Sequence, residues 1–157
     1  MANALHTSLR SPLVVSFVVV FALTAALFGA TFQTQIAVAQ SNTIDGAVTE
    51  LTVGDDEESL LVTIRAENPT SKAMTLTTAQ FVARTDGEEL TNYGTQSLSD
   101  AVLAPGEATT FTISLELLDG EADAARAAIE DNEISVGGEL VGYIENVRIS
   151  FGVNNDG

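Results

Sequence analysis

Clusters of acidic side chains are the part of this sequence with the clearest capacity for chemistry. Asp55–Glu58 is an unbroken run of four carboxylates, and Asp119, Glu121 and Asp123 form a second group. Calcium is bound in proteins by several such oxygens at once. The run lacks the alternating Asp-x-Asp spacing and the following glycine that wrap a chain around one ion, and acids suit the first turn of a helix. We therefore expect a solvated loop and a helix start, and no metal site.

Two catalytic arrangements fit the residue types but not their spacing. Ser71 and Lys72 are the types of a Ser/Lys nucleophile pair, yet adjacent residues of a strand or turn point apart. The 22 acids allow many carboxylate pairs of the glycosidase kind, but the overall acidic composition explains them better. The chain has no cysteine or tryptophan, and its one histidine is His6. We predict that the protein is not an enzyme and needs no cofactor.

Charge divides the chain into two parts. Residues 1–40 contain no acid, whereas residues 41–157 contain all 22 acids and five of the six basic residues, a net charge of −17. Binding to nucleic acid needs clustered cations, so we expect no nucleic-acid partner. Such an acid excess is typical of proteins in concentrated electrolyte, where the Debye length is about 3 Å at 1 M. We interpret the source as an extreme halophile.

The acid-free part contains a membrane-directed segment. Residues 13–30 carry no charge, and a helix over residues 12–32 would be about 31 Å long, enough to cross a bilayer. Arg10 precedes the segment and the acids follow it, so the positive-inside rule places the acidic part outside the cytoplasm. Ala37-Val38-Ala39 before Gln40 fits a signal-peptidase site. Residues 1–40 are thus either a signal peptide cleaved between Ala39 and Gln40 or a retained membrane anchor.

Alternation of apolar and polar residues predicts strands in the acidic part. The clearest are Ser59–Glu67, Thr109–Leu117 and Val147–Val153. Weaker patterns cover residues 48–53, 74–76, 79–84 and 140–144. One alanine-rich segment, Glu121–Glu130, predicts a short helix, with Asp119 or Gly120 as its N-cap and Asn132 at its end.

Three dipeptides predict the turns between these strands. Asn68-Pro69 ends one strand, because proline fixes φ and biases the preceding residue toward extended geometry. Asp86-Gly87 is a type I′ hairpin signal, and Pro105-Gly106 is a type II signal. These six residues are Asn68, Pro69, Asp86, Gly87, Pro105 and Gly106.

The elements together predict one domain over residues 44–153. About 110 residues is the usual size of a single sandwich domain and suffices without disulfides. We therefore expect an all-β fold, an immunoglobulin/fibronectin-like antiparallel β-sandwich with one short helix, preceded by an N-terminal hydrophobic helix.

The order of these motifs resembles the late embryogenesis abundant type 2 family, whose archaeal members carry the water-stress and hypersensitive-response (WHy) domain. The likeness rests on Val62–Pro69, the Gly87 hairpin, Pro105-Gly106 and Gly138–Leu140. The resemblance implies a fibronectin-like β-sandwich with a helix, and a role in desiccation or osmotic-stress tolerance without catalysis. The chain departs from many members in lacking a longer polar segment with a second Asn-Pro.

Two kinds of function follow from these observations. The first is a noncatalytic, exported or membrane-tethered module that protects or binds other components under stress, held at the membrane by residues 13–30 if these are retained. The alternative is a structural subunit of a surface appendage or an extracellular adhesion module, since Arg10–Val15 loosely resembles a type IV pilin signature. The sequence names no ligand or client protein.

Overall fold

The computed structural model describes residues 19, 22, 35–36, 39–40 and 43–155. The chain divides into two compact units, Met1–Ile36 and Ala37–Gly157. The predicted hydrophobic helix, residues 13–30, lies almost wholly outside the described residues. Within the described part of the chain, no helix has the length and apolar character needed to cross a membrane.

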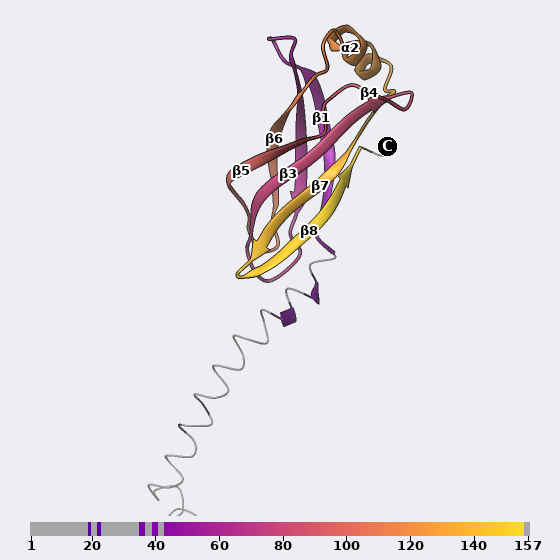
Figure 1. Cartoon of the computed structure of the whole chain (residues 1–157). Coiled ribbons are helices and arrows are strands. Elements are labelled where there is room, and N and C mark those ends of the chain that lie inside the picture. Colours follow the sequence, from indigo (N-terminus) through magenta and orange to yellow (C-terminus); the bar gives the residue numbers. More distant parts are fainter. Residues whose placement is uncertain (1–18, 20–21, 23–34, 37–38, 41–42, 156–157) are drawn as a thin grey trace, which may run out of the picture. The chain divides into compact units, whose positions relative to one another are not determined.

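The second unit is mostly β-structure with one short helix (Figure 1). Its elements in chain order are β1 (Asp45–Val53), β2 (Ser59–Glu67), β3 (Met74–Thr85), β4 (Glu88–Glu89), β5 (Gly94–Leu103), β6 (Ala108–Glu116), α2 (Ala122–Glu130), β7 (Ile134–Ile144) and β8 (Val147–Asn154).

The strands form one sheet, so the predicted immunoglobulin/fibronectin-like β-sandwich is wrong. The sheet has eight strands in the order β4-β3-β7-β8-β1-β2-β6, with β5 also paired to β3. A sandwich needs two sheets packed face to face. Here the two halves join at β1 and β8, which pair in parallel at Ala47 and Asn154, and the sheet curls into a half-barrel (Figure 1). The alternation of apolar and polar residues shows which face of a strand is buried. A sandwich and a single curled sheet both bury one face of each strand, so this alternation does not distinguish them.

The concave face of the sheet holds the core. Leu60, Val62 and Ile64 of β2 are fully buried, as are Phe81 of β3 and Leu140 of β7. Burying a large aliphatic or aromatic side chain stabilises a fold by roughly 1.5–3 kcal/mol. Burial of this apolar surface drives the folding of the curled sheet without disulfides.

Helix α2 packs against the end of the sheet through Ala125 and Ala128, which are both buried. Its N-cap is Glu121, which makes no side-chain capping bond. The predicted cap at Asp119 or Gly120 is therefore wrong, because a turn in which Glu121 N donates to Leu118 O keeps both residues outside the helix. At the other end, Asn132 has φ 57°, the left-handed geometry of a residue that follows a helix.

Candidate functional site

The side chain of Asn68 is fully buried just after β2. Its Nδ2 donates to the carbonyl oxygens of Lys72 (2.8 Å) and Leu103 (2.9 Å). Its Oδ1 accepts from the backbone N–H (3.1 Å) and the hydroxyl (2.7 Å) of Thr70. An asparagine amide has two donors and an oxygen with two lone pairs, so its capacity is fully used. Asn68 therefore ties the turn after β2 to the end of β5, and Pro69 follows as an exposed residue.

The backbone of Asn68 joins this turn to the one at Pro105-Gly106. Gly106 N donates to Asn68 O at 2.7 Å, and Asn68 N donates to Glu107 O at 3.0 Å. Glu107 N donates in turn to Ala104 O at 3.2 Å, and Gly106 has φ 70°, as the third residue of a type II turn requires. Two of the three turn dipeptides thus lie side by side.

The third dipeptide lies at the opposite end of β3. Asp86 and Gly87 have φ 50° and 86°, and they connect the paired residues Thr85 and Glu88. Positive φ at both central residues is the requirement of a type I′ hairpin. The six turn residues shape the fold at two separate places and do not converge on a chemical site.

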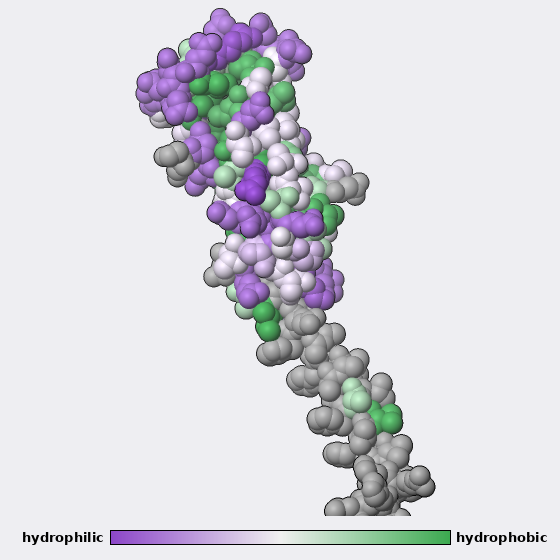
Figure 2. Space-filling view, turned by 180° about the vertical axis from the view of Figure 1, so that it is seen from behind, coloured by the Kyte–Doolittle hydropathy of each residue, from purple (hydrophilic) through white to green (hydrophobic). Residues whose placement is uncertain are grey.

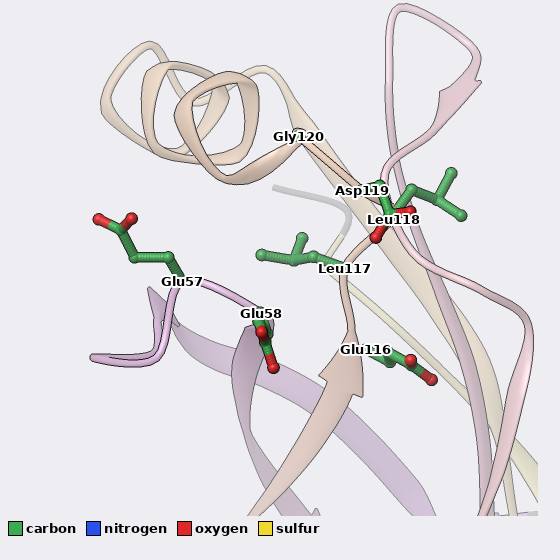
Figure 3. A pocket seen from close by; sticks show the side chains of 7 residues that line it. All are labelled: Glu57, Glu58, Glu116, Leu117, Leu118, Asp119 and Gly120. Carbon is green, nitrogen blue, oxygen red and sulfur yellow. The ribbon is translucent and has the colours of Figure 1, made fainter.

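An acidic pocket of about 430 Å³ lies between the β1–β2 loop and the segment that leads into α2 (Figure 3). It is lined by Glu57, Glu58, Glu116, Leu117, Leu118, Asp119 and Gly120. Figure 3 shows the carboxylates of Glu57, Glu58 and Glu116 pointing in different directions. Among residues 43–155 and the few others described, no three His, Cys, Asp or Glu side chains are grouped so that they could hold a metal ion.

The acid run Asp55–Glu58 is exposed, and its members have different partners. Asp56 Oδ1 accepts from the backbone N–H groups of Glu58 and Ser59, both at 3.1 Å, and from the Ser59 hydroxyl at 2.8 Å. These bonds, the one from the Ser59 hydroxyl first, lower the pKa of Asp56 below its usual 3.8. The carboxylate of Asp56 therefore shapes the β1–β2 loop.

Arg126 of α2 links two acids near this loop. It donates to Glu57 Oε1 at 2.7 Å and to Asp123 Oδ1 at 2.9 Å, and these bonds, the one to Glu57 first, raise the pKa of Arg126. All three side chains are largely exposed, so solvent screens each pair and its contribution to stability is small. The link holds the helix near the β1–β2 loop.

The side chains of Ser71 and Lys72 were predicted to point apart, and they have different surroundings. Lys72 Nζ lies 3.1 Å from Glu145 Oε1, in the β7–β8 turn. Ser71 is exposed. Lys72 is thus engaged in an ion pair with a distant residue and does not face its neighbour as a catalytic base.

A pH series on the variant Asp56→Asn should reveal the role of Asp56. Its folded pKa is depressed, so its stabilising effect is present above pH 3.8 and is lost as the pH falls through the lower folded pKa. Asp56→Asn should therefore be less stable than the wild type at pH 7, and the difference should shrink at acid pH. Asp55→Asn, at the exposed neighbouring carboxylate, is the control, and it should change stability at pH 7 less than Asp56→Asn, because it leaves the bonds between Asp56 and Ser59 in place. Chemical denaturation at each pH measures both differences.

Salt should raise the stability of the domain strongly. At about 0.01 M salt the Debye length is roughly 30 Å, so the acids repel one another across the whole domain. Each 1 kcal/mol of unscreened repulsion should lower the melting midpoint by about 4–8 °C. The double variant Asp55→Asn/Glu58→Gln, which leaves Asp56 and Glu57 in place, should melt higher than the wild type at low salt and equally at high salt. Thermal melts followed by circular dichroism test this, and a midpoint independent of salt would contradict it.

A second, smaller depression lies between α2 and β1. Its volume is about 230 Å³, and Val48, Leu51, Ile129 and Ile134 form its apolar lining. Figure 2 shows hydrophobic surface among hydrophilic side chains at the end of the domain that carries the helix. Thr49, Glu50, Asn132 and Asn155 complete the lining. Asn155 uses both of its amide atoms on β7, accepting from Val136 N and donating to Ile134 O, so it has a structural role.

Comparison with known proteins gives a likeness of fold only. No protein-family model matches the chain, and no curated protein matches it. A solution structure named as that of a candidate late embryogenesis abundant (LEA) protein, At2g46140.1, has a TM-score of 0.50 at 12% identity, covering 88% of this chain and 82% of that one.

Two further solved structures show lower scores. A crystal structure of a protein from Archaeoglobus fulgidus has a TM-score of 0.47 at 16% identity, covering 71% of this chain and 89% of that one. The solution structure of AT1g01470 from Arabidopsis thaliana has a TM-score of 0.46 at 18% identity, covering 70% and 79%. The likeness of fold rests on the structure of At2g46140.1 alone.

Proposed function

We propose that the protein is a noncatalytic module that protects or binds other cell components under desiccation or osmotic stress. The observation that carries the proposal is the likeness of its fold to that of the candidate LEA protein At2g46140.1. The residues support it further, because the pocket carboxylates diverge and the buried Asn68 serves the fold. On this proposal the surface of the folded domain acts through binding and not through turnover.

A drying assay with the purified protein tests this role. A labile enzyme is dried and rehydrated with the protein, and its recovered activity is measured. We expect clear protection by the wild type and much less by Gly138→Ala, a variant with the same charge, under conditions in which circular dichroism shows this variant to be unfolded. Equal protection by the two proteins would contradict a folded module, because acidic composition alone would then suffice.

We further propose that the domain lies outside the cytoplasm. The support is the apolar segment 13–30 with Arg10 before it and 22 acids after it. Mass spectrometry of the native protein should find a chain that begins at Gln40, or else an intact chain in the membrane fraction. Protease added to intact cells should digest residues 41–157 in the second case. Protection of the acidic domain in intact cells would overturn this topology.

The absence of enzymatic activity is part of the same proposal. Screens with esterase, glycosidase, phosphatase and protease substrates at high salt should show no turnover. A turnover that is abolished by replacing one carboxylate, such as Glu116→Gln in the acidic pocket, would overturn it.

A further inference from the structure

Strands β3, β7 and β8 are neighbours in the sheet and differ in charge from the rest of the domain (Figure 1). They contain a single acid, Glu139, whereas residues 41–157 contain 22 acids in all. Strongly acidic surfaces repel one another, and interfaces between proteins are depleted of charged residues at their centre. These three strands are therefore the part of the domain that a second acidic molecule can approach without repulsion.

One face of these strands points away from the core, and we call it the outer face. Leu140 of β7 and Phe151 of β8 belong to the core, so their neighbours along each strand point to the opposite side of the sheet. On β7 and β8 the outer face consists of three cross-strand pairs, in order along the strands: Tyr143 with Arg148, Val141 with Ser150, and Glu139 with Gly152.

The outer face has the residue types of a protein interface. Tyr143 and Val102 are 41% and 47% exposed, and both are paired with Thr75, which lies between them. Tyr93, the other tyrosine of the chain, is 64% exposed, and its hydroxyl donates to Oε1 of Gln80 on β3 at 3.4 Å. Tyrosine and arginine are enriched at interfaces. Both tyrosines of the chain thus lie on this face, where a partner would cover their apolar rings.

Arg148 and Glu139 are the charged residues of β7 and β8, and neither forms an ion pair within the described part of the chain. Tyr143, which is opposite Arg148, is four residues from Glu139, so the two charges are about 13 Å apart along the strands. Three other basic side chains each pair with an acid: Lys72, Arg84 and Arg126. The outer face therefore carries one positive and one negative group that cannot pair with each other in one chain.

A second copy of the chain can supply the missing partner of each group. If a two-fold axis runs across the strands at the level of Val141 and Ser150, each strand faces its own copy with the order of the pairs reversed. Arg148 of one copy then lies over Gly152 of the other, beside its Glu139, and the same contact is made a second time. The atom nearest to a Cβ built at Gly152 is 3.9 Å away, so there is space for the arginine. Aligned sheets pack face to face in this way at about 10 Å.

We propose that the protein forms a two-fold symmetric dimer in which the outer faces of two copies pack together, with two ion pairs between Arg148 and Glu139. The four strands β5, β3, β7 and β8, about 4.8 Å apart and each about ten residues long, give a face of about 600 Å² on each copy. Two such faces reach the lower end of the range for specific interfaces, so the dimer should be reversible. The inference goes beyond the stress role and does not depend on it, because it follows from the register and charges of β7 and β8.

Sedimentation equilibrium of the full chain in a nonionic detergent and molar salt tests the dimer. The wild type should pass from monomer to dimer between about 1 and 100 µM protein. Arg148→Glu should raise the dissociation constant about tenfold or more, because it places two carboxylates against each other. Arg65→Glu, the same change at an exposed arginine of β2, should leave the constant unchanged. A wild type that stays monomeric throughout, or a dimer that Arg148→Glu does not weaken more than Arg65→Glu, would overturn the proposal. Association through residues 13–30 would give the second of these results.

Exchange of the two charges tests the pairing itself. The double variant Arg148→Glu/Glu139→Arg should dimerise again, because both ion pairs return with their signs reversed. A double variant that circular dichroism shows to be folded and that stays monomeric would overturn the pairing. If this variant does not fold, cross-linking makes the test.

Cross-linking locates the two-fold axis. The chain has no cysteine, so a short bismaleimide can join the variant Ser150→Cys only to a second copy at the same position. Ser150 lies at the proposed axis, and this variant should cross-link efficiently. Ser114→Cys, the same change at an exposed serine of β6, is the control and should cross-link much less. Equal cross-linking of the two variants, or none at Ser150→Cys, would overturn the proposed interface.

Discussion

Replacing Gly138 by alanine should lower the free energy of unfolding by about 3 kcal/mol or abolish folding. Gly138 lies in β7 opposite Phe81 of β3. A Cβ at this position would overlap the carbonyl oxygen of Gln80 and lie 2.5 Å from Cγ of Phe81. The Phe81 ring is fully buried and the Gln80 oxygen belongs to the backbone, so neither can move without disturbing the sheet. Chemical denaturation in molar salt measures the loss.

Gly152→Ala is the matched control for Gly138→Ala. Gly152 lies in the neighbouring strand β8, and the nearest atom to an added Cβ is 3.9 Å away. The same chemical change should therefore alter stability by no more than about 0.5 kcal/mol. Equal losses at the two glycines would show that the clash at Gly138 is not the cause.

Replacing Asn68 should have a comparably large effect. Asn68→Ala removes the donors to Lys72 O and Leu103 O and the acceptor for Thr70, and each buried group left without a partner costs about 1–3 kcal/mol. Because these losses are not additive, we expect a total of about 3–4 kcal/mol.

Asn68→Asp is the more specific test of the same turn. The shape is kept, but a carboxylate would face the carbonyl oxygens of Lys72 and Leu103 with no proton to donate. This variant should be at least as unstable as Asn68→Ala at pH 7 and should recover part of the loss at acid pH, where the added carboxyl is protonated. Asn154→Ala, at an exposed asparagine of β8, is the control and should be near neutral. Denaturation curves in which both Asn68 variants match the wild type would contradict the structural role of Asn68.

The positions of the regular strands could be predicted from the sequence with accuracy. The predicted bounds of β2 are those observed, β6 is shifted from its prediction by one residue at both ends, and β8 extends one residue beyond its prediction. Each of these strands buries alternate apolar residues against the core, and that alternation is visible in the sequence. The two segments predicted at residues 74–76 and 79–84 form the single strand β3, because an irregularity between Leu76 and Thr78 interrupts the alternation.

Strand β5 and the single sheet could not be predicted. The sequence of β5, Gly94–Leu103, contains serine, threonine and glutamine among its first residues and shows no clear alternation, because residues 94–97 are all exposed. The parallel contact of β1 with β8 joins residues 107 positions apart, Ala47 and Asn154, and no local pattern reports it. The sequence therefore predicted half-buried strands correctly and their assembly incorrectly.

The predicted turn residues had local signals, whereas their partners did not. Asn68-Pro69 marks a strand end by its own chemistry, but Leu103, which accepts from Asn68, is 35 residues away. The acid run Asp55–Glu58 predicted a solvated loop, and the specific bonds of Asp56 to Ser59 depend on the loop geometry.

Survival of the source organism after drying and osmotic shift tests the proposed role most directly. A strain lacking this gene is complemented with the wild type, Gly138→Ala or Gly152→Ala, all at matched protein levels. Survival should fall in the deletion strain and return with the wild type and Gly152→Ala, but not with Gly138→Ala. Equal survival of the deletion strain and its parent, or full rescue by a Gly138→Ala protein shown to be unfolded, would contradict a folded stress-protective module.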